Sequence, residues 1–380
     1  MQMAITNGIA LESQWRCLTP SDAMNRAGWT AKLIHYTGFM ASAPSSTIPY
    51  DFAVGEWLRE ADLIIVQRNI IMPDIVNAMK YWQAVKNKVV VVDLDDAYHM
   101  LDASNPALTF WHENREQNHA MDYLIEGLSI SDGLIAPNRN LLNDFNTLAG
   151  VPGYYLQNYA EKDWWTDLPS RDEMKKKLGL EGRIVIGWGG SVSHFNSFVG
   201  SGVMEAAGLI AKRYPEVTFL ICGNDGRILE NLPVPASQLQ HQDSVPPSEW
   251  PKVVKTYDIG MAPLFWDYDH RRSWLKGIEY ALAGVPWIGS GGGVNATYSD
   301  LAHLGTLVKN TELNWYNALQ SKIDNLGKEQ IKAERFIPQA QKLFIADNQT
   351  AVFEAVYRQI IGDTRKRGRI REGMPGVVHI

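Results

Sequence analysis

The stretch RRSWLKGIEYALAGVPWIGSGGG, residues 271–293, holds the pattern that decides the fold. A helical pattern that begins at Arg272 is followed by a turn at Gly284 and by an apolar run led by a proline. A helix that leads directly into a buried strand is the repeating unit of a parallel α/β sheet. Three consecutive glycines then end the strand, so the pattern predicts a loop at its carboxyl end.

The same alternation of apolar run and helical pattern recurs along the chain. Because the runs are continuous rather than alternating, they indicate strands that are buried on both faces of a parallel sheet. The strands are expected at 61–68, 88–96, 131–138, 183–190, 217–223, 258–264 and 285–293. The sequence therefore predicts an α/β protein with two doubly wound, Rossmann-like parallel-sheet domains that face each other across a cleft, with ligands at the carboxyl ends of the strands.

A polar segment divides the predicted strands into two groups. Residues 158–182 contain Pro169 and a short charged helical pattern, which is typical of a connection between domains. We expect a first domain over 1–157, a second over 183–345, and a terminal helix with a basic tail over 346–380.

The composition is that of a soluble globular protein. The chain has 380 residues, 45% of them hydrophobic and 21% charged, with a net charge of -6 that gives no general reason to expect a polyanionic partner. The two cysteines lie far apart without metal-ligand spacing, which favours a reducing compartment. No signal peptide or transmembrane run is visible, so a cytoplasmic location is expected, with peripheral attachment to the inner face of a membrane as an extension of it.

Three charged residues share one edge of the helix predicted from Arg272. At about 100° per residue, Arg272, Lys276 and Glu279 fall together beside the apolar face. One interpretation is an ordinary ion-pair network, which stabilises a helix by ~0.2–0.5 kcal/mol per pair. The other is that the cations bind phosphates while the carboxylate accepts hydrogen bonds from hydroxyls.

Two glycine loops favour the second interpretation. The strand at 183–190 runs into GWGGSVSH, residues 187–194, and the strand at 285–293 ends in its own glycine run. Glycines at such positions let backbone N–H groups approach an anion. The first loop is not a Walker A motif, and Val192 stands where a dinucleotide fingerprint would have its third glycine.

These segments resemble retaining glycosyltransferases of the GT-B fold, close to the large family 4 type. The resemblance is carried by GWGGSVSH, by YDIGMAPL at 257–264 and by SWLKGIEYALAGVPWIGS at 273–290. More loosely, ADLIIVQR at 61–68 and the following VVVVDLDDAYH resemble an acceptor domain of such enzymes. The resemblance implies a donor-binding second domain, an acceptor-binding first domain and a terminal helix that crosses back to the first.

The resemblance also implies roles for individual residues. Glu279 would hold the ribose hydroxyls of the nucleotide, and Lys276 and Arg272 would contact its diphosphate. The remaining donor-binding residues would come from the loops around them: Gly189, Gly190, Ser191, His194, Gly223, Asn224, Ser290, Gly291, Gly292 and Gly293.

The sequence departs from the family pattern at Arg271. This position, eight residues before Glu279, usually holds a second glutamate that contacts the donor sugar. The usual cations after the first strand of this domain are also missing, and His194 lies in that region instead. Arg271 is therefore counted among the donor-binding residues, and the identity of the sugar is left open.

An acidic cluster ends the strand at 88–96. Its members Asp93, Asp95, Asp96 and His99 allow three interpretations: a helix cap, a metal-binding D-x-D motif, or contact with the acceptor. We favour the third, with Asp96 and His99 as the residues that orient the acceptor.

The sequence therefore predicts a glycosyltransferase that moves a sugar from a nucleotide-sugar donor to an acceptor hydroxyl with retention of configuration and without a metal or other cofactor. The alternatives are a nucleotide-sugar epimerase and a non-catalytic nucleotide-sugar-binding protein. The acceptor would be a glycan, a lipid-linked sugar or a modified nucleic acid, the last bound by a basic tail. Its cations are Arg365, Lys366, Arg367, Arg369 and Arg371.

Overall fold

The computed structural model describes residues 2–7, 14–45, 48–68, 70–101, 103, 105–113, 119–223, 226–265, 267–291 and 297–372. It divides into two compact units. The first comprises Met1–His99, Thr109–Tyr159 and Gln349–Ile380, and the second comprises Met100–Leu108 and Ala160–Asn348. Among the described residues, no helix is both long enough and apolar enough to cross a membrane.

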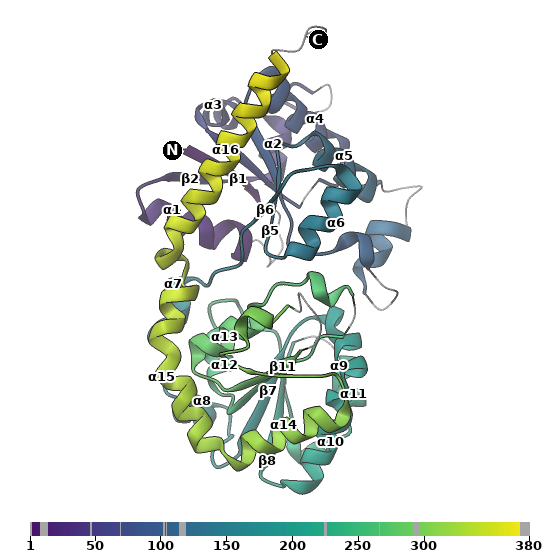
Figure 1. Ribbon diagram of the computed structural model, residues 1–380, viewed down its shortest axis with the longest axis vertical. Helices are drawn as coiled ribbons and strands as arrows, with labels where there is room; N and C mark the ends of the chain where they lie inside the picture. The colour runs from purple at the N-terminus through teal and green to yellow at the C-terminus, as the bar shows by residue number, and fades with distance from the viewer. Residues whose placement is uncertain are drawn as a thin grey trace. The chain divides into compact units, whose positions relative to one another are not determined.

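The first unit is built on a six-stranded sheet with the order β2-β1-β3-β4-β5-β6, in which all neighbouring strands are parallel. The strands are β1 (Gln2–Asn7), β2 (Thr30–His35), β3 (Leu63–Gln67), β4 (Val89–Asp93), β5 (Leu134–Ala136) and β6 (Gly153–Tyr155). The helices of this unit are α1 (Thr19–Arg26), α2 (Tyr36–Ala41), α3 (Phe52–Glu60), α4 (Pro73–Lys80), α5 (Ala120–Ile130), α6 (Arg139–Ala149) and α16 (Thr350–Glu372). The last of these, at the yellow end of the chain, packs against α1 and β6 (Figure 1).

The second unit is built on another six-stranded parallel sheet, with the order β12-β11-β10-β7-β8-β9. Its strands are β7 (Ile184–Gly189), β8 (Val217–Cys222), β9 (Leu239–Gln242), β10 (Ile259–Ala262), β11 (Trp287–Ser290) and β12 (Thr306–Val308). The helices are α7 (Lys162–Trp165), α8 (Arg171–Lys177), α9 (Phe195–Ser201), α10 (Val203–Arg213), α11 (Gly226–Asn231), α12 (Trp250–Lys255), α13 (Leu275–Ala283), α14 (Glu312–Asp324) and α15 (Leu326–Phe344).

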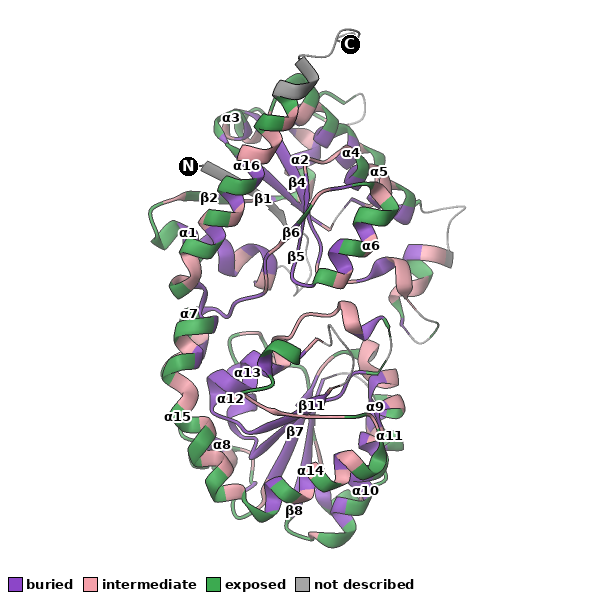
Figure 2. Ribbon diagram, in the orientation of Figure 1, coloured by how far each residue is buried: buried purple, intermediate pink, exposed green. Residues whose placement is uncertain are grey.

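Helices cover both faces of this second sheet. Helices α9, α10, α11 and α14 contact one another in one layer, and α8, α12, α13 and α15 form the other (Figure 1). The interior strands β7, β8, β10 and β11 between them are buried, and the outer sides of the helices are exposed (Figure 2). Two helical layers around a parallel sheet are the doubly wound arrangement, so the predicted fold class is confirmed for each unit.

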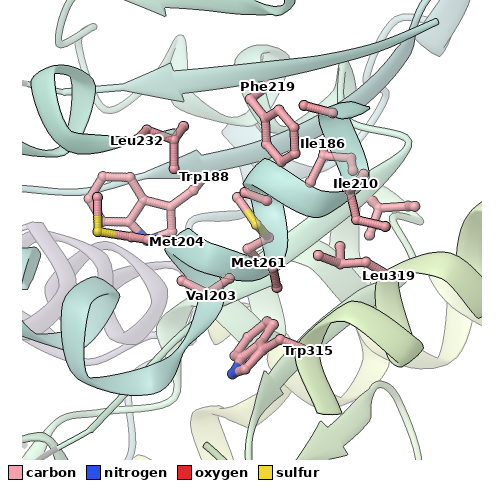
Figure 3. Close-up of a cluster of buried hydrophobic side chains, with 14 of the residues drawn as sticks. Ile186, Trp188, Val203, Met204, Ile210, Phe219, Leu232, Met261, Trp315 and Leu319 are labelled. Atoms are coloured by element: carbon pink, nitrogen blue, oxygen red, sulfur yellow. The ribbon is translucent and has the colours of Figure 1, made fainter. Parts of the chain in front are cut away.

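The core of the first layer explains why these elements pack. Trp188 of β7, Phe219 of β8 and Met261 of β10 belong to one buried cluster with Trp315 of α14 (Figure 3). Burying one such side chain contributes ~1.5–3 kcal/mol to folding, which is why the strands that carry them are continuously apolar.

Two predictions of local structure were wrong. The helix expected from Arg272 begins only at Leu275, because Arg272 has extended backbone angles, φ -73° and ψ 156°, after a short 3-10 helix over Asp269–Arg271. The segment expected as a basic tail is helical as far as Glu372, because α16 continues to that residue. Within it, Arg365 and Lys366 are exposed, whereas Arg367 donates to the Asp132 carbonyl; the side chains of Arg369 and Arg371 lie outside the described part.

Candidate functional site

The strand order of the second unit reverses at one position in its sheet. The chain moves from β7 outward through β8 to β9, and then returns to the other side of β7 to build β10, β11 and β12. In doubly wound sheets ligands bind at this reversal, beyond the carboxyl ends of the two strands that flank it. Here these strands are β7 and β10, and the loops that follow them are 190–194 and 263–274.

Arg272 joins these two loops. Its Nη1 lies 2.6 Å from His194 Nε2, and its Nη2 donates to Ser193 Oγ at 2.9 Å. Burial, together with the positive charges of Arg272 and Lys276, holds the pKa of His194 well below its usual range. The imidazole is therefore neutral at pH 7 and can accept a hydrogen bond from the guanidinium.

A buried carboxylate fixes the orientation of Arg272. Asp269 is 1% exposed, and its Oδ1 lies 3.1 Å from Arg272 Nε. Its Oδ2 accepts hydrogen bonds from Ser197 Oγ and from the backbone N–H of Phe265, both at 2.7 Å. Arg272 is thus held by a prebuilt anchor that also compensates its charge.

Lys276 adds a second cation, with different surroundings. Its Nζ lies over the Trp188 ring, 5.4 Å from the centroid. Burial is the main cause that lowers the pKa of Lys276 to about 8, partly offset by the charge of Glu279. Within the described residues this ammonium has no hydrogen-bond acceptor. A desolvated cation with three unused donors attracts an anion that can accept from it.

Glu279 lies one turn further along α13 and is 6% exposed. The Trp250 side chain donates a hydrogen bond to its carboxylate, but burial outweighs this bond and the charge of Lys276, so the pKa of Glu279 is raised to about 7. The helix therefore presents a cation and a carboxylate close to the point where the strand order reverses. The predicted proximity of Arg272, Lys276 and Glu279 holds, although only two of them lie on the helix.

Three glycines at the carboxyl ends of β7 and β8 are required by packing within the unit. A Cβ at Gly189 would overlap the Trp250 ring, and one at Gly190 would overlap the Trp188 ring. Gly223 has φ +124°, and a Cβ there would overlap the Gly190 carbonyl. These three glycines are required by packing inside the protein, so they are not by themselves a sign of an anion site.

The carboxyl end of β11 also differs from the expectation. The Gly291 N–H donates to the Val308 carbonyl at 2.7 Å, and Ser290 Oγ bridges the Leu264 N–H and the Asn310 side chain. The Gly291 N–H is therefore not the open donor that the sequence suggested, and the Ser290 hydroxyl is also occupied within the protein. Gly292, Gly293 and Asn224 lie outside the described residues.

Two other predicted residues lie at the rim of this site. Ser191 is exposed and its hydroxyl lies 2.9 Å from Ser193 Oγ. Arg271 is half-buried and donates to the Asp267 carbonyl at 2.8 Å. Neither contact fixes a ligand-binding role.

A second polar cluster lies at the carboxyl ends of β3 and β4 in the first unit. Asp93 forms a buried, two-pronged pair with Arg16, at 2.6 and 2.8 Å. Both of its oxygens are therefore occupied, which leaves it unsuited to the metal-binding D-x-D interpretation. Arg68, at the end of β3, has a positive φ of 31°, a strained value for a residue with a side chain, and donates to the Tyr98 hydroxyl.

Asp95 follows Asp93 by two residues and has a carboxylate oxygen that can accept a further hydrogen bond. Burial is the main cause that raises the pKa of Asp95 to about 7. Its Oδ1 is buried and has no hydrogen-bond partner among the described residues. The residues that the sequence favoured are engaged elsewhere: Asp96 Oδ1 accepts from the Ala97 N–H, and His99 Nε2 lies 3.0 Å from Asp144 Oδ2.

Sequence reasoning missed several residues of both clusters. Trp250, Arg16 and Arg68 lie far along the chain from the residues they contact, and Asp269 was also missed. One local signal was available, because Asp269 precedes Arg272 by three residues, a spacing at which side chains meet in a helical turn.

No protein-family model matches the chain, and no curated protein matches its sequence. Among solved structures, HepE of Anabaena in complex with UDP-glucose is similar with a TM-score of 0.63 and 14% identity, over 93% of this chain and 99% of HepE.

Two further structures are similar over nearly their whole length. Sucrose-phosphate synthase from Thermosynechococcus elongatus has a TM-score of 0.62 and 12% identity, over 95% of this chain and 100% of the other. A UDP-forming α,α-trehalose-phosphate synthase from Burkholderia xenovorans has a TM-score of 0.61 and 10% identity, over 95% and 99%. These neighbours are GT-B glycosyltransferases, and the chain has their GT-B fold.

Proposed function

We propose that the protein is a glycosyltransferase that takes a sugar from a nucleotide-sugar donor and transfers it to an acceptor hydroxyl. The observation that carries the proposal is the position of Arg272 and of Lys276, with its unused donors, where the strand order reverses. The UDP-glucose bound in HepE is consistent with a nucleotide-sugar ligand for this fold.

The proposed chemistry is the departure of a nucleoside diphosphate. As the bond between the sugar and the diphosphate breaks, negative charge grows on the leaving phosphate oxygen. Lys276 donates hydrogen bonds to it, and Arg272, already oriented by Asp269, adds positive charge without reorganisation during the reaction. With both cations supplied by side chains, we propose that transfer does not require a metal.

Glu279 is proposed to bind the ribose of the donor. Its carboxylate can accept from two adjacent hydroxyls, and the bond from Trp250 fixes the orientation in which it does so. Retention of anomeric configuration is part of the same proposal: the acceptor hydroxyl attacks on the face that the diphosphate leaves, and its proton passes to a phosphate oxygen.

We place the acceptor contact at the polar cluster of the first unit. Asp95 Oδ1, which has no hydrogen-bond partner among the described residues, can accept a hydrogen bond from an acceptor hydroxyl. An acceptor could be a glycan, a lipid-linked sugar or a modified nucleic acid.

The test is thermal unfolding of the protein with UDP, GDP, ADP, CDP and dTDP, each with and without Mn²⁺. At 100 times its dissociation constant, a ligand stabilises the folded state by ~2.7 kcal/mol, which gives a clear shift. The shift should be independent of Mn²⁺, weaker in Glu279→Ala and unchanged in Glu205→Ala, a control that alters an exposed glutamate of the same unit. If no nucleotide shifts the transition, the proposal is wrong.

A second function, nucleotide-sugar binding without catalysis, is favoured by one observation. Arg271 stands where related enzymes have a sugar-binding glutamate, and its guanidinium is bound to the Asp267 carbonyl. Release of free nucleoside diphosphate from the donor, measured with a coupled assay and a panel of acceptors, separates the two functions. Binding without any release would support the non-catalytic one.

A further inference from the structure

A small cavity opens on the second unit at the opposite edge of its sheet from the candidate donor site. Val285 and Pro286, which precede β11, and Gly305, which precedes β12, belong to its wall, so it lies at the amino ends of these strands. Helices α13, α14 and α15 complete the wall, and the volume is about 120 Å³.

Much of the wall is apolar. Ala281 of α13, Leu304, and Ala333 and Phe336 of α15 contribute hydrocarbon surface. The Phe336 ring meets His303 edge to face at 6.1 Å, so two rings of the wall hold each other in place. An apolar cavity of about 150 Å³ can hold one benzene ring, so this space suits a ligand of similar or slightly smaller size.

Basic side chains border this apolar wall. Lys322 of α14 is only 6% exposed, and its Nζ donates to Glu329 Oε2 at 2.8 Å. An ammonium has three donors, and Glu329 is its one acceptor among the described residues, so two donors remain at a buried nitrogen. Lys332 and His303 are exposed at the rim and also line the cavity.

The balance of charge therefore favours an anion. One carboxylate, Glu329, faces two lysines, and it is already paired with the buried one. A buried donor without an acceptor destabilises the folded state, and an anion seated between Lys322 and Lys332 would accept from it.

We propose that this cavity is a binding site for a small organic anion with a flat apolar body. The apolar part lies against Phe336 and Ala281, and the carboxylate or phosphate accepts from Lys322 and Lys332. The proposal does not rest on the glycosyltransferase function, since none of the lining residues belongs to the candidate donor site.

The test uses benzoate, phenyl phosphate and neutral benzamide as probes with the full-length protein. For ligands of this size a dissociation constant on the order of 1 mM is expected, measurable by isothermal titration or by ligand-observed NMR. Benzoate or phenyl phosphate should bind and benzamide should bind at least tenfold more weakly. The better of the two anions distinguishes a carboxylate ligand from a phosphate ligand.

Variants locate the binding. Lys332→Met should weaken the better anion at least fivefold, and Ala333→Phe, which fills the cavity, should abolish binding. Lys328→Met is the matched control, because it removes an exposed lysine of the same helix that does not line the cavity. Lys322→Met should also weaken binding, but Lys332→Met remains informative if the loss of a buried lysine impairs folding.

Three outcomes would overturn the proposal. The first is that neither anion binds, which would mean that the cavity holds water only. The second is that benzamide binds as well as benzoate, and the third is that saturating UDP competes with the probe. Competition by UDP would instead assign the probe to the donor site, so failure of this inference is distinguishable from failure of the proposed function.

Discussion

Binding of a nucleoside diphosphate should take up protons from solution at pH 8, and Lys276 should be their destination. Because the pKa of Lys276 is about 8, roughly half of the free protein carries a neutral amine at that pH. A phosphate charge 4 Å away stabilises the ammonium by ~4 kcal/mol at an effective dielectric constant of about 20, which is enough to keep it protonated. The expected uptake is therefore ~0.5 proton per nucleotide bound.

The assay is isothermal titration with UDP at pH 8 in two buffers of different ionisation enthalpy, since the difference in apparent binding enthalpy gives the number of protons exchanged. At this pH the terminal phosphate, with a pKa of about 6, is already ionised and contributes little. Lys276→Met should bind more weakly and take up close to no protons.

Glu279→Gln separates the two titrating groups of α13. The charge of Glu279 raises the pKa of Lys276, so its removal lowers that pKa and leaves more neutral amine at pH 8. Uptake should then rise toward one proton per nucleotide. If Glu279 were the destination instead, the same variant would lose the uptake. Tight binding by the wild type with no measurable uptake at pH 8 would refute the reasoning.

Three further predictions concern stability. Gly187→Ala would place a Cβ within a buried tyrosine ring and should lower the free energy of unfolding, measured by chemical denaturation, by ~1–3 kcal/mol. Gly327→Ala, in a helix with open space around it, should be neutral or stabilise by up to ~1 kcal/mol. Equal effects of the two variants would contradict the packing argument. Asp93→Asn leaves Arg16 buried without its carboxylate and should destabilise by ~3–5 kcal/mol, and a loss below ~1 kcal/mol would show that the pair is dispensable. The pKa of Asp95 rises from 3.8 to about 7 on folding, so the folded state binds more protons between these values and the contribution of Asp95 to stability falls as pH rises. In thermal unfolding, the stability of Asp95→Asn relative to the wild type should therefore increase from pH 4 to 7. A difference that does not depend on pH would contradict this.

The interior strands were largely predictable from sequence, and the edge strands were not. All seven strands expected from continuous apolar runs are present, because strands buried on both faces have no position for a polar side chain. The strands that were missed include all four sheet edges: β2, β6, β9 and β12. An edge strand is short or partly exposed, as in the exposed–buried alternation of β2, so it has no continuous run.

The interior strand β1 was also missed, for a related reason. Its sequence, QMAITN, mixes polar and apolar residues and offers no apolar run of the kind used to find the others. The fold class could still be inferred, because the strands that were found already alternate with helices in both halves of the chain.

The glycines show why site prediction from sequence was less secure than fold prediction. Gly189 makes room for Trp250, and Gly187 makes room for Tyr257, each more than 60 residues away. A glycine that admits a ring and a glycine that admits a phosphate look the same in one sequence. The distinction depends on which side chain occupies the space, and that is a property of the folded chain.

The two cations of the candidate donor site differ in a way that bears on how the site works. Arg272 contacts Asp269, Ser193 and His194 and so joins two loops. Among the described residues, the Lys276 ammonium lies over the face of the Trp188 ring and has no hydrogen-bond acceptor, and burial lowers its pKa. Arg272 therefore contributes a charge that is already compensated, and its main effect is on geometry. On the proposed function, we expect the interaction gained on binding a diphosphate to come mostly from Lys276, because its ammonium has no acceptor among the described residues.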